Sequence, residues 1–122
     1  MIRIWLAVAG LGGAASVIAG ALAAHLSDDA RAAGLLRTGA LYGMVHAAVL
    51  IALIGLAQGR EPRRGAAMVA GWSFAGGIVL FVFSLFALAG GAPRWVGWAT
   101  PVGGSGLILG WVALGALAFR RR

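Results

Sequence analysis

The chain has 122 residues, of which 61% are hydrophobic and only 11% are charged. A soluble domain has about 25% charged residues, so this composition excludes a domain that folds in water. The net charge is +7 and every basic residue is an arginine, but the arginines stand at the ends of apolar runs. That placement is typical of membrane-interface anchors and not of a nucleic-acid surface, so we expect no nucleic-acid partner. The absence of cysteine excludes disulfides and thiolate metal sites.

The first apolar run covers residues 4–24, contains no charge and is long enough to cross a bilayer. A secretory signal peptide is the alternative, with Arg3 as its basic start and Ala21-Leu22-Ala23 as a cleavage site. The apolar core of a signal peptide has about 7–15 residues, and this run is longer. We therefore interpret it as a membrane span.

Residues 27–37 predict a short interfacial helix that leads into a second span over residues 38–57. Ser27 is the expected N-cap of that helix, with Asp28 and Asp29 in its first turn. The helix lies at the membrane surface because it carries most of the charge on this part of the chain.

A polar turn at residues 58–65 contains the helix breakers glycine and proline and separates the second span from a third, over residues 66–89. A tight loop follows, in which Pro93 cannot continue a helix, and the fourth span covers residues 96–119. The sequence therefore predicts one all-α domain over residues 1–122, a bundle of four transmembrane helices with short loops.

The distribution of arginine predicts the orientation of these spans, because cytoplasmic loops are enriched in basic residues. One side carries seven arginines and the other carries Arg31, Arg37 and Arg94. This difference favours cytoplasmic termini in a bacterial inner (plasma) membrane, to which the lysine-free composition rich in alanine and glycine also points. Tryptophans near the span ends predict an aromatic belt at the interfaces, formed by Trp5, Trp95 and Trp98.

Small residues recur at intervals of four along three of the spans. Since lipid tails are as apolar as leucine, helices in a bilayer associate by close packing, which such rows allow. The rows are Gly12, Ser16, Gly20 and Ala24 in the first span, Gly39, Gly43 and Ala47 in the second, and Gly106 and Gly110 in the fourth.

Polar side chains gather in the outer half of the predicted bundle. At 1.5 Å per residue, His46, Ser16 and Ser105 lie about 12 Å below the outer boundary and Ser84 about 8 Å. Tyr42 and His46 are four residues apart and share a helix face. One interpretation is a ligand pocket that opens outwards; the other is that these groups bond one another and fix the helix register. The candidate pocket residues are His25, Tyr42, His46, Ser84, Thr100 and Ser105.

The same residues give little support to a cofactor, a metal or a reaction. Two histidines at different depths suit neither haem nor a metal ion, so we expect no cofactor and no metal site. No carboxylate lies within a span, which disfavours an ion-driven transporter. Ser84 and His46 have no third member to orient them, so we identify no catalytic residue and expect no enzyme.

Four segments together resemble the YgdD-like small membrane proteins, a bacterial family of unknown function with mitochondrial relatives. They match the family in order and spacing: Gly20-Ala21-Leu22-Ala23-Ala24-His25, Tyr42-Gly43-Met44-Val45-His46-Ala47, Phe83-Ser84-Leu85, and Thr100-Pro101-Val102-Gly103-Gly104 with Gly110-Trp111. The chain departs from the family at Ala23, often glycine there, and at Leu85-Phe86. The resemblance implies four spans and marks His25, Tyr42, Ser84 and Thr100 as family positions, but it implies no activity.

Taken together, the sequence favours a protein without enzymatic activity. We expect an accessory or scaffolding subunit of a membrane protein complex, or a lipid-organising protein, with lipids and other membrane subunits or further copies of itself as partners. The alternative is a module that binds or transports a lipid headgroup or a small polar ligand in the outer polar pocket.

Overall fold

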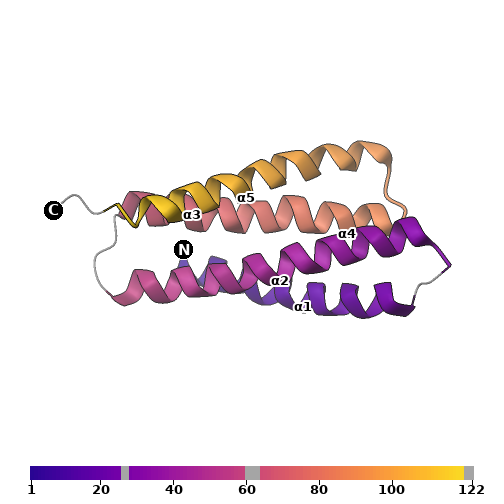
Figure 1. Ribbon diagram of the computed structural model, residues 1–122, viewed down its shortest axis with the longest axis horizontal. Helices are drawn as coiled ribbons and strands as arrows, with labels where there is room; N and C mark the ends of the chain where they lie inside the picture. Colours follow the sequence, from indigo (N-terminus) through magenta and orange to yellow (C-terminus); the bar gives the residue numbers. More distant parts are fainter. Residues whose placement is uncertain (26–27, 60–63, 120–122) are drawn as a thin grey trace.

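The computed structural model describes residues 1–25, 28–59 and 64–119, which form four long helices side by side (Figure 1). The first hairpin consists of α1 (Ile2–His25) and α2 (Ala30–Gly59). In the second, α3 (Arg64–Gly77), the π-helical turn η1 (Ile78–Val82) and α4 (Phe83–Ala89) follow one another, and a 3-10 helix, η2 (Arg94–Trp98), leads into α5 (Ala99–Ala116).

The predicted all-α bundle of four spans is confirmed. Each of the four helical stretches is long and apolar enough to cross a bilayer, and the described residues contain no strand. We call the end of the bundle at which α1 and α4 end the His25 end, and the opposite end the Met1 end. α1 begins and α5 ends at the same end, the Met1 end (Figure 1).

The second helix differs in detail from the sequence-based expectation. α2 begins at Ala30 and runs through Thr38 without a break, so the expected interfacial helix and the second span are one helix of 30 residues. The carboxylate of Asp29 accepts a hydrogen bond from the backbone N–H of Ala32 at 2.9 Å and so caps the helix. The expected cap, Ser27, lies outside the described residues.

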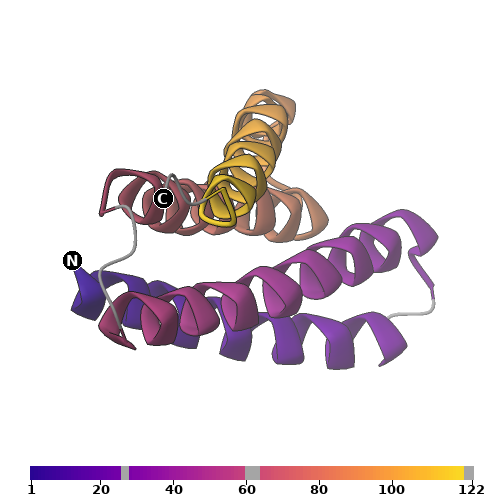
Figure 2. The same ribbon diagram turned by 60° about the vertical axis from the view of Figure 1, so that its left-hand side comes forward.

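The hairpins are stacked, with α3 and η1 between α5 and the α1–α2 pair (Figure 2). α1 packs along α2, and α5 packs along α3 and η1. The main contacts between the hairpins are made by α2, which packs on α3, η1 and α4. As a result, α5 is attached to the rest of the molecule mainly through α3 and η1.

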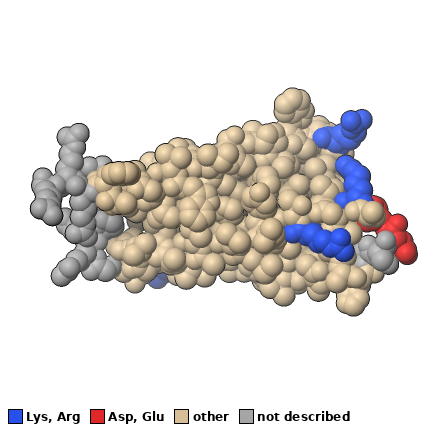
Figure 3. Space-filling view, in the orientation of Figure 1, with Lys and Arg blue, Asp and Glu red and all other residues tan. Residues whose placement is uncertain are grey.

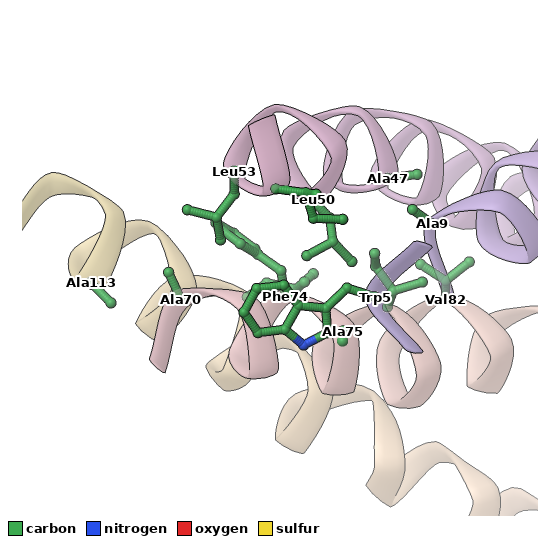
Figure 4. Packing of buried hydrophobic residues seen from close by; sticks show 13 residues of the cluster. Trp5, Ala9, Ala47, Leu50, Leu53, Ala70, Phe74, Ala75, Val82 and Ala113 are labelled. Carbon is green, nitrogen blue, oxygen red and sulfur yellow. The ribbon is translucent and has the colours of Figure 1, made fainter. Parts of the chain in front are cut away.

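The hydrophobic core lies where the two hairpins meet (Figure 4). Phe74, Leu50 and Val82 are almost completely buried in it. Trp5 is buried as well, with its ring packed against Gly71, so the expectation that it belongs to an aromatic belt was wrong. Trp95 and Trp98, in contrast, are 72% and 78% exposed at the His25 end, as a belt requires.

Small residues occupy the closest contacts between helices. Between α1 and α2, Gly43 lies against Ser16 and Gly20 against Ala40. Between η1 and α5, Gly103 lies directly on the backbone of Phe81, where a side chain would have no space. Ala24 faces outwards, so the predicted row in the first span contributes to packing only in part.

This contact leads to a prediction for Gly103. A Gly103→Ala variant should unfold more readily by about 1–3 kcal/mol, because the added methyl group would force α5 away from the η1 backbone. Gly10→Ala is the matched control, since nothing lies within 4 Å of the added atom. The measurement is unfolding in mixed detergent micelles followed by circular dichroism; equal stability of the two variants would contradict the proposed close approach.

Candidate functional site

The polar residues singled out in the sequence fall into separate groups in the structure. His46 bonds across the bundle to α5, and Ser84 bonds to Thr100 at the start of α5. Ser105 and His25 are exposed and take part in neither contact. The distribution of these bonds bears on whether the layer is a ligand pocket or a set of structural contacts.

His46, in the middle of α2, is 5% exposed and has partners on both ring nitrogens. Its Nδ1 lies 2.7 Å from the backbone carbonyl oxygen of Tyr42, one turn earlier on the same helix. Its Nε2 lies 3.1 Å from the indole Nε1 of Trp111 on α5. The side chain therefore connects the two hairpins.

These partners determine the tautomer of His46. A carbonyl oxygen only accepts a hydrogen bond, so Nδ1 must carry the proton and donate it to Tyr42. An indole N–H only donates, so Nε2 must be unprotonated and accept from Trp111. In this arrangement the ring is neutral, and no nitrogen remains to bind a metal ion or to act as a base.

Aromatic rings surround His46 and form what we call the aromatic seam: Tyr42, His46, Phe74, Phe81 and Trp111. The rings of Tyr42 and His46 are stacked, with centroids 5.8 Å apart, and Trp111 meets His46 edge-on at 6.0 Å. Tyr42 and Trp111 are 42% and 45% exposed, whereas Phe74 and His46 are buried, so the seam reaches the surface mainly through these two rings. Such aromatic pairs add packing energy to the hydrogen bond between His46 and Trp111.

A second polar contact lies beside the π-helical turn. The hydroxyl oxygens of Ser84 and Thr100 are 2.7 Å apart, and Ser84 donates to the backbone carbonyl of Phe81 at 2.8 Å. Since Ser84 uses its proton on Phe81, the hydroxyl of Thr100 donates to Ser84. This chain of bonds ties the start of α5 to the turn in which the regular helical bonding changes.

The other polar residues of this layer have local hydrogen-bond partners or none. Ser16 is buried and donates to the carbonyl of Gly12 at 2.7 Å, and exposed Ser105 donates to the carbonyl of Pro101 at 2.9 Å. His25 ends α1 and is exposed. Among the described residues no three histidine or acidic side chains gather into a possible metal site.

Trp111 is the residue of this layer that the sequence-based reasoning missed. In the sequence it stands out only as part of a Gly-Trp motif, although its side chain supplies the bond to His46. A signal was present, because an indole N–H in the middle of a span needs an acceptor. The acceptor lies 65 residues earlier, and the sequence gives no direct sign of that pairing.

A hollow of about 370 Å³ is present elsewhere, at the His25 end, and we call it the α1–α4 groove. It is lined by apolar residues of α1, by one residue of α2 and by the end of α4: Ala15, Ile18, Ala19, Leu22, Leu36, Phe86, Ala89 and Gly90. None of the polar candidates lines it. Next to its lining residues, the guanidinium of Arg37 donates to the carbonyl of Ala23 at 3.5 Å.

Comparison with known proteins identifies the family. Residues 19–104 match the family described as "Protein of unknown function (DUF423)". The chain belongs to this family. It is also 34% identical over 121 residues to a "UPF0382 membrane protein" of Haemophilus influenzae, with 97% of this chain and 95% of that protein covered. No solved structure matches.

The family assignment agrees with the four membrane-capable helices: this is a membrane protein of a family without a known function. Neither family description names a reaction. The matched range includes His25, Tyr42, His46, Ser84 and Thr100, whereas Ser105 and Trp111 lie beyond it. The partner of His46 therefore belongs to the part of the chain outside the family match.

The bond between His46 and Trp111 leads to a prediction that a double-mutant cycle can test. We expect Trp111→Phe and His46→Leu to be coupled by about 0.6 kcal/mol and at most about 1.7 kcal/mol, the range of hydrogen bonds between membrane helices. Trp72→Phe is the control, because Trp72 has a similar exposure of 44%. The coupling energy is calculated from the free energies of unfolding of the four proteins in detergent micelles. A coupling energy of zero between Trp111 and His46 would contradict the hydrogen bond.

Proposed function

We propose that this protein is a non-enzymatic accessory membrane protein that organises lipid or packs against other membrane proteins. The observation that supports this most directly is the state of the polar layer. The buried polar side chains of this layer, His46, Ser84 and Ser16, are bonded to other groups of the bundle. In this arrangement they serve as bundle contacts.

The geometry gives little support to catalysis. A general base needs an available nitrogen or carboxylate near the reacting atom, and both nitrogens of His46 already have partners. Ser84 directs its hydroxyl to a backbone carbonyl and not to a base. A nucleophile activated in the usual way would instead be paired with a histidine or a comparable group.

The exposed surface supports an assembly role. Gly10, Ala14 and Ala21 are exposed on α1, in addition to the small residues that pack inside the bundle. In a bilayer such residues let a neighbouring helix approach closely. The partner would be another membrane protein or a second copy of this chain.

The α1–α4 groove supports the lipid-organising part of the proposal. Its lining is apolar and it lies at the surface of a span, where acyl chains are the surrounding solvent. A hollow of this kind receives a lipid chain without the loss of any polar contact.

The alternative function is a module that binds or transports a lipid headgroup or small polar ligand. The half-exposed rings of Tyr42 and Trp111 beside His46 favour it, because a ligand could reach them from the surface between α2 and α5. To bind His46, such a ligand would have to displace the hydrogen bond to Tyr42 or to Trp111. For that reason we place it second.

One experiment distinguishes these functions. The protein is extracted from its native membrane in a mild detergent, and the bound proteins and lipids are identified by mass spectrometry. We expect retained lipid or a membrane protein at a fixed ratio to the chain. A lone monomer with neither would contradict the proposal, and a small polar molecule that is lost on Tyr42→Phe would favour the alternative.

We further propose that the protein lies in the inner (plasma) membrane with both termini in the cytoplasm, as a member of the YgdD-like branch. Two observations support this orientation. α1 begins and α5 ends at the same end of the bundle, as an even number of spans requires (Figure 1). Seven of the ten arginines stand in the sequence near the start of α1, around the turn between α2 and α3, or after α5, and the positive-inside rule favours the cytoplasm for the side that these segments share.

The orientation can be tested with reporter fusions. A fluorescent protein fused after Arg122 should be bright, and a phosphatase fused there should be inactive, because the former matures in the cytoplasm and the latter outside it. The reverse pattern is expected for both reporters when they are inserted at residues 90–94. Phosphatase activity at the C-terminal fusion would contradict the orientation.

A further inference from the structure

The α1–α4 groove is a hollow whose contents can be inferred from its chemistry. Its lining contains aliphatic and aromatic side chains and glycine, without a charged or hydroxyl-bearing residue. It lies between α1 and α4, with Leu36 of α2 as its third wall. Its volume of about 370 Å³ is within the usual size range of ligand sites. A polar ligand would find no hydrogen-bond partner among these side chains.

The size of the groove disfavours a helix of another protein. Its α1 wall extends only from Ala15 to Leu22, about two helical turns, and eight residues line it in total. A specific protein interface has about 20–30 residues on each side. A single flexible chain, in contrast, fits a short apolar trench and needs no extended matching surface.

A cationic group stands beside the groove at the His25 end. Leu22 and Leu36 line the groove, and the residues that follow them, Ala23 and Arg37, are joined by a hydrogen bond. The bond places the guanidinium at the carbonyl end of α1, where the helix dipole favours positive charge. It uses one of several N–H donors of that group, so others can bind an anion.

Charge elsewhere on the molecule agrees with this position. In Figure 3 charged side chains lie at the His25 end, and the middle of the long flank beside them shows no charge. Arg37 itself is exposed. An apolar trench inside the bilayer with an arginine at its membrane-surface end matches a molecule that has an acyl chain and a phosphate.

We propose that the α1–α4 groove binds one acyl chain of a phospholipid from the leaflet at the His25 end, with the lipid phosphate on Arg37. This inference rests on the lipid-organising part of the proposed function and assigns the ligand and the residues that hold it. The groove selects a chain by shape and lack of polarity, and Arg37 selects an anionic headgroup.

The test uses two kinds of variant: substitutions that fill the groove without changing the charge, and a substitution that removes the charge of Arg37. The full chain is reconstituted in vesicles of phosphatidylglycerol and phosphatidylethanolamine, extracted in mild detergent, and examined by native mass spectrometry. We expect one retained phospholipid per chain, preferentially phosphatidylglycerol. Ala15→Leu and Ala89→Leu should abolish its retention, because the added side chains occupy the trench.

Charge removal and matched controls complete the design. Arg37→Gln should lower the occupancy about fivefold, the factor expected for one arginine near an anionic lipid. Ala52→Leu is the control for bulk, because Ala52 is exposed on α2, sixteen residues beyond Leu36, and Arg64→Gln is the control for charge at the other end. Both controls should retain lipid as the wild type does, and inorganic phosphate alone should give no bound mass.

The possible outcomes separate this inference from the broader proposal. Lipid retention at the wild-type level in both groove-filling variants would overturn the groove as the site. An equal loss of lipid in all variants and controls would overturn it as well. A retained second copy in place of lipid would overturn it too. If the wild type retains lipid that the groove variants do not affect, only this inference fails; if it retains neither lipid nor protein from its native membrane, the proposed function fails. If one filling variant does not fold, as judged by circular dichroism, the other decides.

Discussion

Close approach of helix backbones is the constraint on which the rest of this structure depends. In a bilayer, apolar burial does not favour helix–helix contact over helix–lipid contact, so association requires tight packing. At the contact of α5 with η1, Gly103 lies on the backbone of Phe81, and at the contact of α1 with α2, Gly43 lies against Ser16. The π-helical turn is located where Gly103 meets residues 80 and 81, so the irregular turn and this close approach of two backbones coincide.

Polar contacts then determine how the two hairpins fit together. Because α5 packs mainly on α3 and η1, the few bonds from α5 to other helices are important for its position in the bundle. The bond from Trp111 to His46 is one such link, and the bond from Thr100 to Ser84 fixes the beginning of α5. Both use groups that are costly in hydrocarbon when unpaired. His46 and Ser84, two of the candidate pocket residues, are thus bonded to other parts of the bundle.

The His25 end is where a functional surface is best supported. It combines the α1–α4 groove, the exposed tryptophans of η2, and Arg37 of α2, which bonds a carbonyl near the end of α1. These features suit contact with lipid, and the polar layer lies deeper between the helices. Membrane helices can hold a small molecule or pack against another helix, and the His25 end has an apolar groove and exposed tryptophans that suit such contacts. The family remains one of unknown function, so lipid retention is the property to establish first.

The sequence by itself determined the class of protein and the number of spans. Apolar runs separated by short polar turns can fold stably only as helices that satisfy their own backbone bonds in lipid, and this is a local property. It also located the polar residues by depth, since depth follows from position along a helix.

The tertiary structure decided which of those residues meet, because rotation of each helix about its axis depends on packing with its neighbours. Trp5 stands near a span end, where a belt is expected, but Gly71 provides a space that buries it. Trp111 and His46 are 65 residues apart, and only the stacking of the two hairpins brings them together. The groove likewise arises from walls on α1, α2 and α4, none of which has a sequence feature that marks it.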